Sequence, residues 1–266
     1  MLTKRLIACF DIIDGRVTKA MRFQDNIDVA PAEELAGTMY DAGIDELIFY
    51  DIMASAEKRG IDIETVKKVA RRVFIPFTVG GGIKDLDGMY EALKAGAEKI
   101  SVDSMAVRNP DIISEGAKAF GSQCVVLSTQ VKRAAHMPSG YEVYIDGARF
   151  ATGMDAVQWV KRGQELGAGE ICLNSIDNDG TLSGYDLELM KLAQASLSVP
   201  LIASGGAGAP EHLKELFAET EAQAAIISSM LYSPRMVKNY AVSELKEYLR
   251  QNNINVRTPY SGPDTL

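Results

Sequence analysis

The second half of this chain repeats the first, and the repeat limits the fold more than any other feature of the sequence. The segment Gly43-Ile44-Asp45-Glu46-Leu47 returns 124 positions later as Gly167-Ala168-Gly169-Glu170-Ile171. Residues 75–82 return at the same offset as residues 199–206, so a helix, a strand and a turn keep register over about 40 residues. Two such halves predict one closed domain with pseudo-twofold symmetry, not two separate domains.

Short β-branched runs alternate with amphipathic stretches along the chain. The runs predicted to be strands are residues 5–11, 46–52, 75–79, 99–103, 123–130, 170–174, 199–204 and 223–228. The predicted helices are residues 31–42, 62–72, 86–95, 110–120, 154–166, 187–195, 211–218 and 243–252. Eight units of about 33 residues in a chain of 266 predict an α/β fold, a single (β/α)8 TIM barrel. The alternative is an open doubly wound sheet, but the chain lacks the GxGxxG turn that often follows its first strand.

The barrel is predicted to span residues 1–257, with halves of about 1–122 and 123–257. Residues 258–266 are polar, contain two prolines and are predicted to form a flexible C-terminal tail.

Charge and composition exclude several classes of function. The chain has 28 Lys and Arg against 36 Asp and Glu, a net charge of −8, which argues against nucleic-acid binding. No apolar run is long enough to cross a membrane, and the N-terminus has no signal-peptide pattern, so a cytoplasmic location is expected. The three cysteines lie in apolar runs without CxxC spacing, which predicts neither a disulfide framework nor a metal site.

The connections after the first and fifth strands differ. Residues 14–30 form a long polar stretch, predicted to be a lid over the barrel. In the second half, residues 141–145 and 148–150 are predicted to form a hairpin around Asp146-Gly147.

Paired glycine-rich turns predict two phosphate sites. In a TIM barrel the active site lies at the carboxyl ends of the strands. There, backbone N–H groups of a glycine-rich turn and a helix N-terminus can face an anion. Each turn alone is as well explained by a tight turn with positive φ, but the pair predicts a substrate with a phosphate at each end. The residues assigned to these two phosphate cradles are Gly81, Gly82, Asp103 and Ser104 in the first half, and Ser204, Gly205, Gly206, Ser228 and Ser229 in the second.

Between the cradles, Asp11 ends the first strand and Gln130 ends the fifth. Asp51 ends the second strand, and Asp179 lies beyond the sixth. A carboxylate at a barrel strand end indicates proton transfer or substrate positioning. For Asp51 and Asp179, hydrogen bonding within a loop is an equal alternative.

At the opposite end of the barrel, charged residues begin four strands: Arg5, Glu46, Lys99 and Glu170. Two cations and two anions there are predicted to close a ring. One interpretation is a structural ion-pair plug, which the residues alone favour, and the other is a polar gate on the barrel axis.

With these residues the chain resembles the cyclase subunit of imidazole glycerol phosphate synthase, a family of histidine biosynthesis, over about residues 1–257. The motifs that carry the resemblance include Lys4-Arg5-Leu6-Ile7-Ala8-Cys9, Asp14-Gly15-Arg16-Val17, Phe77-Thr78-Val79-Gly80-Gly81-Gly82-Ile83, Phe120-Gly121-Ser122-Gln123, Asp179-Gly180-Thr181 and Ile202-Ala203-Ser204-Gly205-Gly206-Ala207-Gly208.

The resemblance implies a heterodimer in which a glutaminase docks on the N-terminal face of the barrel. Ammonia would pass the charged ring and react with a ribulosyl formimino aminoimidazole carboxamide bisphosphate. The products would be imidazole glycerol phosphate and aminoimidazole carboxamide ribotide, with no cofactor or metal. It also implies that Asp11 is a general acid/base and that Lys19 lies near a phosphate, with further substrate contacts at Asn174, Asp179 and Gly180.

Three positions depart from the family pattern. Gln130 stands where the family has its second catalytic aspartate, and Gln cannot carry a proton between groups. Asp103 stands where Asn is usual, and Asn174 where Thr is usual. These departures keep two alternatives open: a divergent paralogue that uses glutaminase-derived ammonia on another substrate, such as a surface-glycan sugar, or a non-catalytic barrel that activates the glutaminase. An engineered form of the synthase also fits the sequence.

Overall fold

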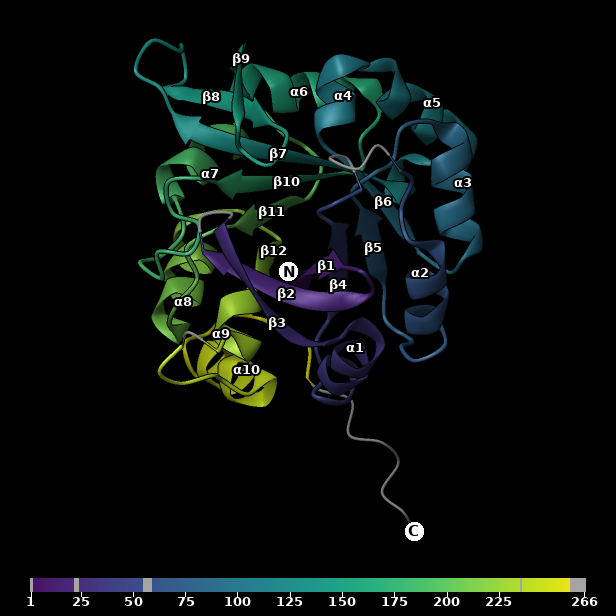
Figure 1. Ribbon diagram of the computed structural model, residues 1–266. Coiled ribbons are helices and arrows are strands. Elements are labelled where there is room, and N and C mark those ends of the chain that lie inside the picture. Colours follow the sequence, from purple (N-terminus) through teal and green to yellow (C-terminus); the bar gives the residue numbers. More distant parts are fainter. Residues whose placement is uncertain (1, 22–23, 55–58, 235, 259–266) are drawn as a thin grey trace.

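Eight parallel strands pair in a closed ring in the computed structural model, which describes residues 2–21, 24–54, 59–234 and 236–258 (Figure 1). The ring runs through β1 (Arg5–Ile13), β4 (Glu46–Asp51), β5 (Phe77–Gly80), β6 (Lys99–Val102), β7 (Val125–Arg133), β10 (Glu170–Ser175), β11 (Leu201–Ser204) and β12 (Ala224–Ile226). Pairing of β12 with β1 and of β7 with β10 closes it. The predicted (β/α)8 barrel is confirmed.

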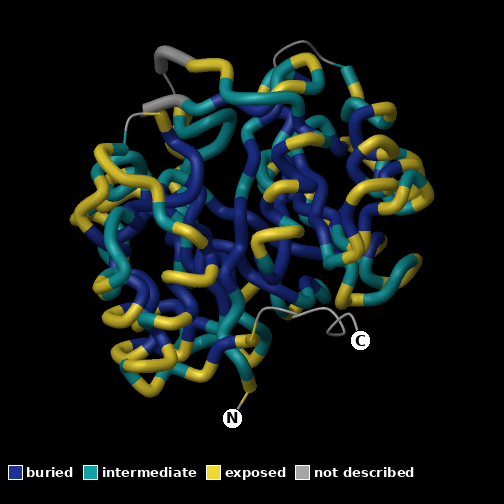
Figure 2. The backbone as a smooth tube through the Cα atoms, turned by 90° about the horizontal axis from the view of Figure 1, so that it is seen from below, coloured by how far each residue is buried: buried dark blue, intermediate teal, exposed yellow. Residues whose placement is uncertain are grey.

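One long helix follows each barrel strand and covers its outer face (Figure 2). These helices are α1 (Ala32–Asp41), α2 (Ile63–Ala70), α3 (Leu86–Lys94), α5 (Asp111–Phe120), α6 (Ala156–Leu166), α7 (Leu187–Gln194), α8 (Pro210–Glu219) and α10 (Val242–Gln251). The structure adds the 3₁₀ turn η1 (Ser122–Cys124) and two five-residue helices, α4 (Ser104–Arg108) and α9 (Ser228–Tyr232). Such short helices show no apolar period, so the sequence did not predict them.

The repeat extends to single hydrogen bonds. Asp62 caps α2 by accepting from the Thr65 N–H, and Asp186, at the same offset of 124, caps α7 by accepting from the Leu189 N–H. Gly81 and Gly205 both have positive φ. A Cβ at Gly81 would lie 2.2 Å from the Asp51 carbonyl oxygen, and one at Gly205 would lie 2.8 Å from the Ser175 carbonyl oxygen, again 124 positions on. The two halves therefore share their turn chemistry as well as their topology.

The polar connection after β1, predicted to be a lid, contains an antiparallel hairpin. Strand β2 (Arg16–Met21) pairs antiparallel with the end of β1 and with β3 (Gln24–Pro31). Its strands are polar because the hairpin stands beyond the barrel, so they lack the apolar alternation that marks a half-buried strand. Ordered hairpin pairing, not a loose loop, thus sits over this side of the barrel.

The second hairpin is confirmed with one correction. Strand β8 (Tyr141–Ile145) is as predicted, but β9 (Phe150–Asp155) begins at Phe150 and not at 148. Asp146, Gly147 and Ala148 all have positive φ, which makes the turn longer than a two-residue one. Helix α6 then begins after Asp155, whose side chain accepts from the Gln158 N–H.

Alternation along the barrel strands separates two cores. Outward residues pack beneath the helices, while a smaller inner cluster on the barrel axis contains Ile7, Ile48, Val126, Cys172 and Ile202 among others. The three cysteines are free. None of the described helices has the length and apolar character needed to cross a membrane.

Candidate active site

The inward-facing residues at the carboxyl ends of the strands form one layer at the mouth of the barrel. On β1, Arg5 faces the axis at the bottom and Ile7 lies in the inner cluster, so strand alternation turns Asp11 inwards at the top. The same alternation, followed along the other barrel strands, turns further residues inwards at their carboxyl ends. These residues are Asp103, Gln130, Asn174, Ser204 and Ser228. In this layer Asn174 is the register partner of both Gln130 and Ser204.

Asp11 lies beside a lysine from the first hairpin. The Lys19 Nζ is 3.8 Å from the Asp11 Oδ2. Burial raises the pKa of Asp11, the nearby Lys19 ammonium opposes this shift, and the charge of Asp179 adds to it. The structure therefore brings Asp11 and Lys19 together, and Asp179 is close enough for its charge to raise the pKa of Asp11.

On the other side of the mouth, Gln130 and Asp103 bind each other. The Gln130 Nε2 donates to the Asp103 Oδ2 at 2.9 Å. Burial raises the pKa of Asp103 to about 7; the Gln130 hydrogen bond and Arg108 lower it, and Asp146 raises it. Within the described residues, the Asp103 Oδ1 and the Gln130 Oε1 are shielded from solvent and have no hydrogen-bond partner. Such atoms call for an explanation, because most buried polar atoms are paired.

In the predicted first phosphate cradle, Gly81 and Gly82 have φ of 82° and 73°. Ser104 begins α4, and its Oγ accepts from the Asp146 N–H at 2.9 Å. The Asp146 carboxylate in turn pairs with Arg108 at 2.5 Å. The second hairpin therefore reaches over this cradle, and Asp103 is turned away from it towards Gln130.

In the second phosphate cradle, Ser228 is used by the protein itself. Its Oγ accepts from the Cys9 N–H at 2.9 Å and donates to the Cys9 carbonyl at 2.8 Å. Ser229 lies in the first turn of α9 and is partly exposed. Gly205 and Gly206 have φ of 91° and 100°, and a Cβ at Gly206 would lie 2.0 Å from the Gly184 carbonyl oxygen, so only glycine fits.

Asp51 lies outside the inward-facing layer. Its neighbours Ile48 and Tyr50 face the axis, so alternation turns Asp51 outwards, where it is buried. The Oδ1 accepts from the N–H groups of Met53 and Ala54 and from the Arg59 Nη2. Asp51 thus organises the turn after β4, the alternative that the sequence left open.

Asp179 and Gly180 lie in the turn after β10. The Asp179 N–H donates to the Ser175 carbonyl, and Gly180 has φ of 71°. Asn178 ties this turn to the Gly184 carbonyl, next to the second cradle. The turn is thereby held at the rim of the mouth.

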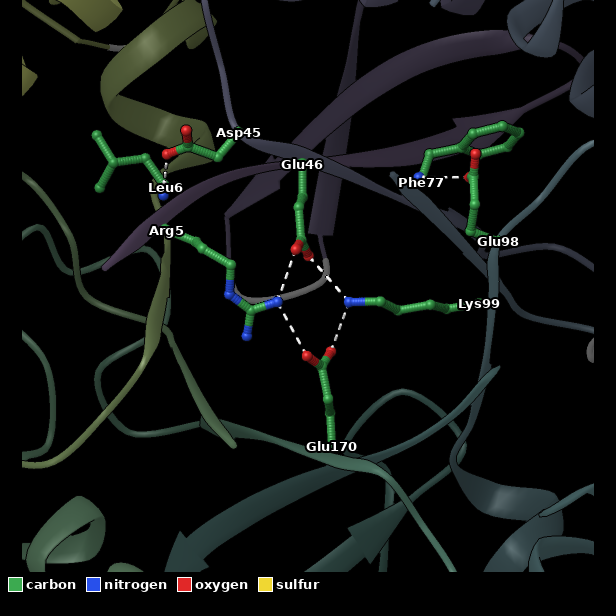
Figure 3. A network of polar contacts seen from close by, with 8 residues as sticks. All are labelled: Arg5, Leu6, Asp45, Glu46, Phe77, Glu98, Lys99 and Glu170. Carbon is green, nitrogen blue, oxygen red and sulfur yellow. Dashed lines mark hydrogen bonds and ion pairs between the residues drawn. The ribbon is translucent and has the colours of Figure 1, made fainter. Parts of the chain in front are cut away.

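At the opposite end of the barrel the four predicted charges form a closed ring (Figure 3). The Arg5 Nη1 lies 2.6 Å from Glu46 and 2.9 Å from Glu170, while the Lys99 Nζ lies 3.3 Å from Glu46 and 2.9 Å from Glu170. All four side chains are at most 14 % exposed. Burial lowers the pKa of Arg5, but the two glutamates outweigh this and raise it. We call this set the charged ring.

Between the ring and the mouth, Tyr50 was missed by sequence reasoning. Its hydroxyl lies 3.2 Å from the Oγ atoms of Ser101 and Ser128, on the barrel axis. The available signal was its position, four residues after Glu46 on an alternating strand. Asp146 was also missed as a site residue, because only the tertiary fold brings the hairpin turn onto Ser104. No group of His, Cys, Asp and Glu in the described part of the chain is arranged to hold a metal ion.

The chain is thus a half-repeat TIM barrel with an acid–lysine pair at its mouth and a charged ring at its base. The chain belongs to the family described as "Histidine biosynthesis protein", whose profile matches residues 5–236. It is 52% identical to the imidazole glycerol phosphate synthase subunit HisF of Desulforapulum autotrophicum, over 97% of this chain and 99% of that protein. The proteins of the same description from Syntrophobacter fumaroxidans and Desulfosudis oleivorans are 50% and 52% identical over the same shares. These matches support the cyclase function in histidine biosynthesis and do not favour the two alternatives.

Proposed function

We propose that this chain is the cyclase subunit of an imidazole glycerol phosphate synthase. It would convert the ribulosyl formimino aminoimidazole carboxamide bisphosphate and ammonia to imidazole glycerol phosphate and aminoimidazole carboxamide ribotide, in the cytoplasm. The observation that carries the proposal is identity of about half the residues over the full length of synthase subunits. We take residues 1–257 as the folding unit; the bridge between Lys4 and Val256 supports this boundary, and most of the proposed tail, residues 259–266, lies outside the described residues.

The substrate would bridge the mouth with one phosphate in each cradle. Backbone N–H groups at Gly82 and Gly206, with Ser104 and Ser229, would hold the phosphates. Asp11 lies inside the mouth, where a proton-transferring carboxyl is needed, and Lys19 adds a positive charge there. The test is a crystal grown with sulfate or phosphate: density at both cradles is expected, and empty cradles with anions bound elsewhere would contradict the assignment.

A glutaminase would dock on the N-terminal face, around the charged ring. That face exposes large apolar side chains: Leu2, before β1, is 85% exposed, and Phe74, before β5, is 80% exposed. Side chains this apolar and this exposed are candidates for contact with a partner. Ammonia entering there would meet the charged ring and then the Tyr50 layer before it reached Asp11.

Replacing Phe74 with Arg tests the docking face. We expect the variant to lose co-elution with the cognate glutaminase, because an aromatic anchor becomes a charge, while ammonium-dependent turnover stays intact. Glu98 is a poorer probe, since its Oε2 accepts from the Phe77 N–H at 2.9 Å and its reversal would disturb β5 itself (Figure 3). Undiminished co-elution of Phe74→Arg would place the partner elsewhere.

The activity itself is tested by turnover of the bisphosphate by the purified chain with ammonium salt, beside Gln130→Asp. Turnover by the unaltered chain is the expected result. Activity only in Gln130→Asp would identify a cyclase barrel disabled at one position. If neither the native chain nor Gln130→Asp turns over the bisphosphate, the proposed function is overturned and the divergent paralogue is favoured.

A further inference from the structure

The mouth of the barrel holds a second carboxyl that the assigned roles do not use. Among the inward-facing strand ends, Asp11 and Asp103 carry carboxyl groups. They come from β1 and β6, which are separated around the ring by β4 and β5, so the two groups face the substrate space from different sides. A bound substrate between the cradles would lie between them.

We propose that Asp103, held by Gln130, is the second proton-transferring group of this site and acts with Asp11 on opposite sides of the substrate. This inference rests on the proposed function, because it assigns a residue to that reaction.

The hydrogen bond between the two side chains leaves Asp103 poised for this role. Gln130 occupies the Oδ2 of Asp103, while the Asp103 Oδ1 and the Gln130 Oε1 are buried without a hydrogen-bond partner. A carboxylate there would be an acceptor without a donor, whereas a neutral carboxyl group offers an O–H to a substrate atom. The buried, unpaired Oδ1 therefore favours the neutral form of Asp103, which has a proton to give.

The surroundings of the two carboxyls favour opposite proton states. The Lys19 Nζ at 3.8 Å favours the charged form of Asp11. Asp103 has no ion-pair partner among the described residues; Arg108 of α4 is occupied by Asp146 of the hairpin turn. Burial raises the pKa of Cys172 of β10, and the charge of Asp103 adds to that shift. The raised pKa of Asp103, about 7, adds that this carboxyl exchanges protons near neutral pH, where general acids work best.

Each of the two carboxyl groups transfers one proton in the proposed reaction. When the C–N bond to the aminoimidazole breaks, its electron pair stays on the departing nitrogen, which takes a proton from the Asp103 carboxyl group. The resulting carboxylate keeps its hydrogen bond from the Gln130 Nε2. The nitrogen supplied by ammonia replaces the ribulosyl carbonyl oxygen, which leaves as water. It loses a proton as it then bonds to the formimino carbon, and the Asp11 carboxylate accepts that proton. Exchange with solvent returns both groups to their starting states.

The test compares Asp103→Asn with the native chain, using ammonium salt and the bisphosphate substrate. We expect kcat to fall at least about 100-fold, while substrate binding, titrated without ammonia, changes less than threefold. The double variant Asp103→Asn/Gln130→Asp moves the carboxyl to the neighbouring strand and is expected to regain at least tenfold. Asp87→Asn, on the exposed start of α3, is the matched control and should behave as native.

The pH profile supplies a second measurement. Because Asp103 acts in its protonated form, the native kcat should fall on the alkaline side with a midpoint near pH 7. Gln130→Leu removes a hydrogen bond that lowers the pKa of Asp103, so its midpoint should move upwards. The pH profile of the native chain tests the role of Asp103 even if Asp103→Asn does not fold. A kcat that is level from pH 6 to 8.5 overturns the inference.

The outcomes separate the two proposals. Native turnover with Asp103→Asn within threefold of it overturns the role of Asp103 and leaves the proposed function standing. No turnover by the native chain overturns the inference, and no turnover by Gln130→Asp either overturns the proposed function as well. Native turnover with a large loss in Asp103→Asn and unchanged substrate binding supports both.

Discussion

The leading strand of the first half-barrel, β1, places Asp11 at the mouth, and the leading strand of the second, β7, places Gln130 there. Around them the backbone is nearly the same: each strand runs on into a hairpin, and each half has a glycine pair of positive φ after its third strand. The partners differ, since Asp11 has the Lys19 ammonium and Gln130 has the Asp103 carboxyl. A repeat thus preserves what backbone packing requires, while side chains at the strand ends are free to diverge in chemistry.

The difference between the halves is tested most strongly at Asp11. Replacing it with Asn keeps the shape but removes the proton carrier, so kcat with ammonium salt should fall by roughly 10²- to 10⁴-fold. Thermal unfolding of the same sample should be close to native, because the residue is partly exposed and pairs loosely. A loss below tenfold would mean that the first half is not the catalytic one.

The two matched helix caps test how far the halves are equivalent. Asp62→Ala removes one cap and should cost about 1 kcal/mol of unfolding free energy. Asp186→Ala should cost about 2–3 kcal/mol, because the buried Tyr141 hydroxyl, which donates to it at 2.9 Å, also loses its partner. Urea unfolding of both variants measures this. Equal costs would show that the added Tyr141 bond contributes nothing.

Asp103 and Ser228 are equivalent strand ends that should respond differently to pH. The folded-state pKa of Asp103 lies above the ordinary value of 3.8, at about 7. Its contribution to stability is therefore full below pH 3.8 and lost as the pH rises to 7. Asp103→Asn should then gain on the order of 1–2 kcal/mol relative to native at pH 8 and nothing at pH 3.5, a figure reduced for its partial exposure.

Ser228→Ala is the control for that measurement. It removes two hydrogen bonds to Cys9 and no titrating group, so its cost should be the same at both pH values. Denaturant unfolding at pH 3.5 and 8 provides the comparison. A gain from Asp103→Asn that does not depend on pH would show that its charge is not the cause.

Much of the architecture could be predicted because it is written in local patterns. Alternating runs and amphipathic stretches located all eight barrel strands and their helices within a few residues. The repeat at an offset of 124 also predicted that the two halves share one topology. The first hairpin was missed because its strands lie beyond the barrel and are polar, and α4 and α9 because five residues show no helical period.

The candidate site could be predicted as a set of positions but not as a set of contacts. The predicted strand ends identified Asp11, Asp103 and Gln130, and the predicted strand starts identified the residues of the charged ring. The sequence also placed Asp51 at a strand end, but it could not say that its side chain turns outwards to Arg59. A shift of one residue in where a strand begins reverses the face of every side chain, so facing is set by pairing with neighbouring strands.

By itself the sequence determined the barrel, its repeat and the family, because periodicity and motif spacing are properties of consecutive residues. Only the tertiary structure decided that Gln130 donates to Asp103, and that Asp146 reaches Ser104. The physical reason is that hydrogen bonds and ion pairs depend on distances of a few ångströms between groups far apart in the chain. Closure of the barrel sets those distances.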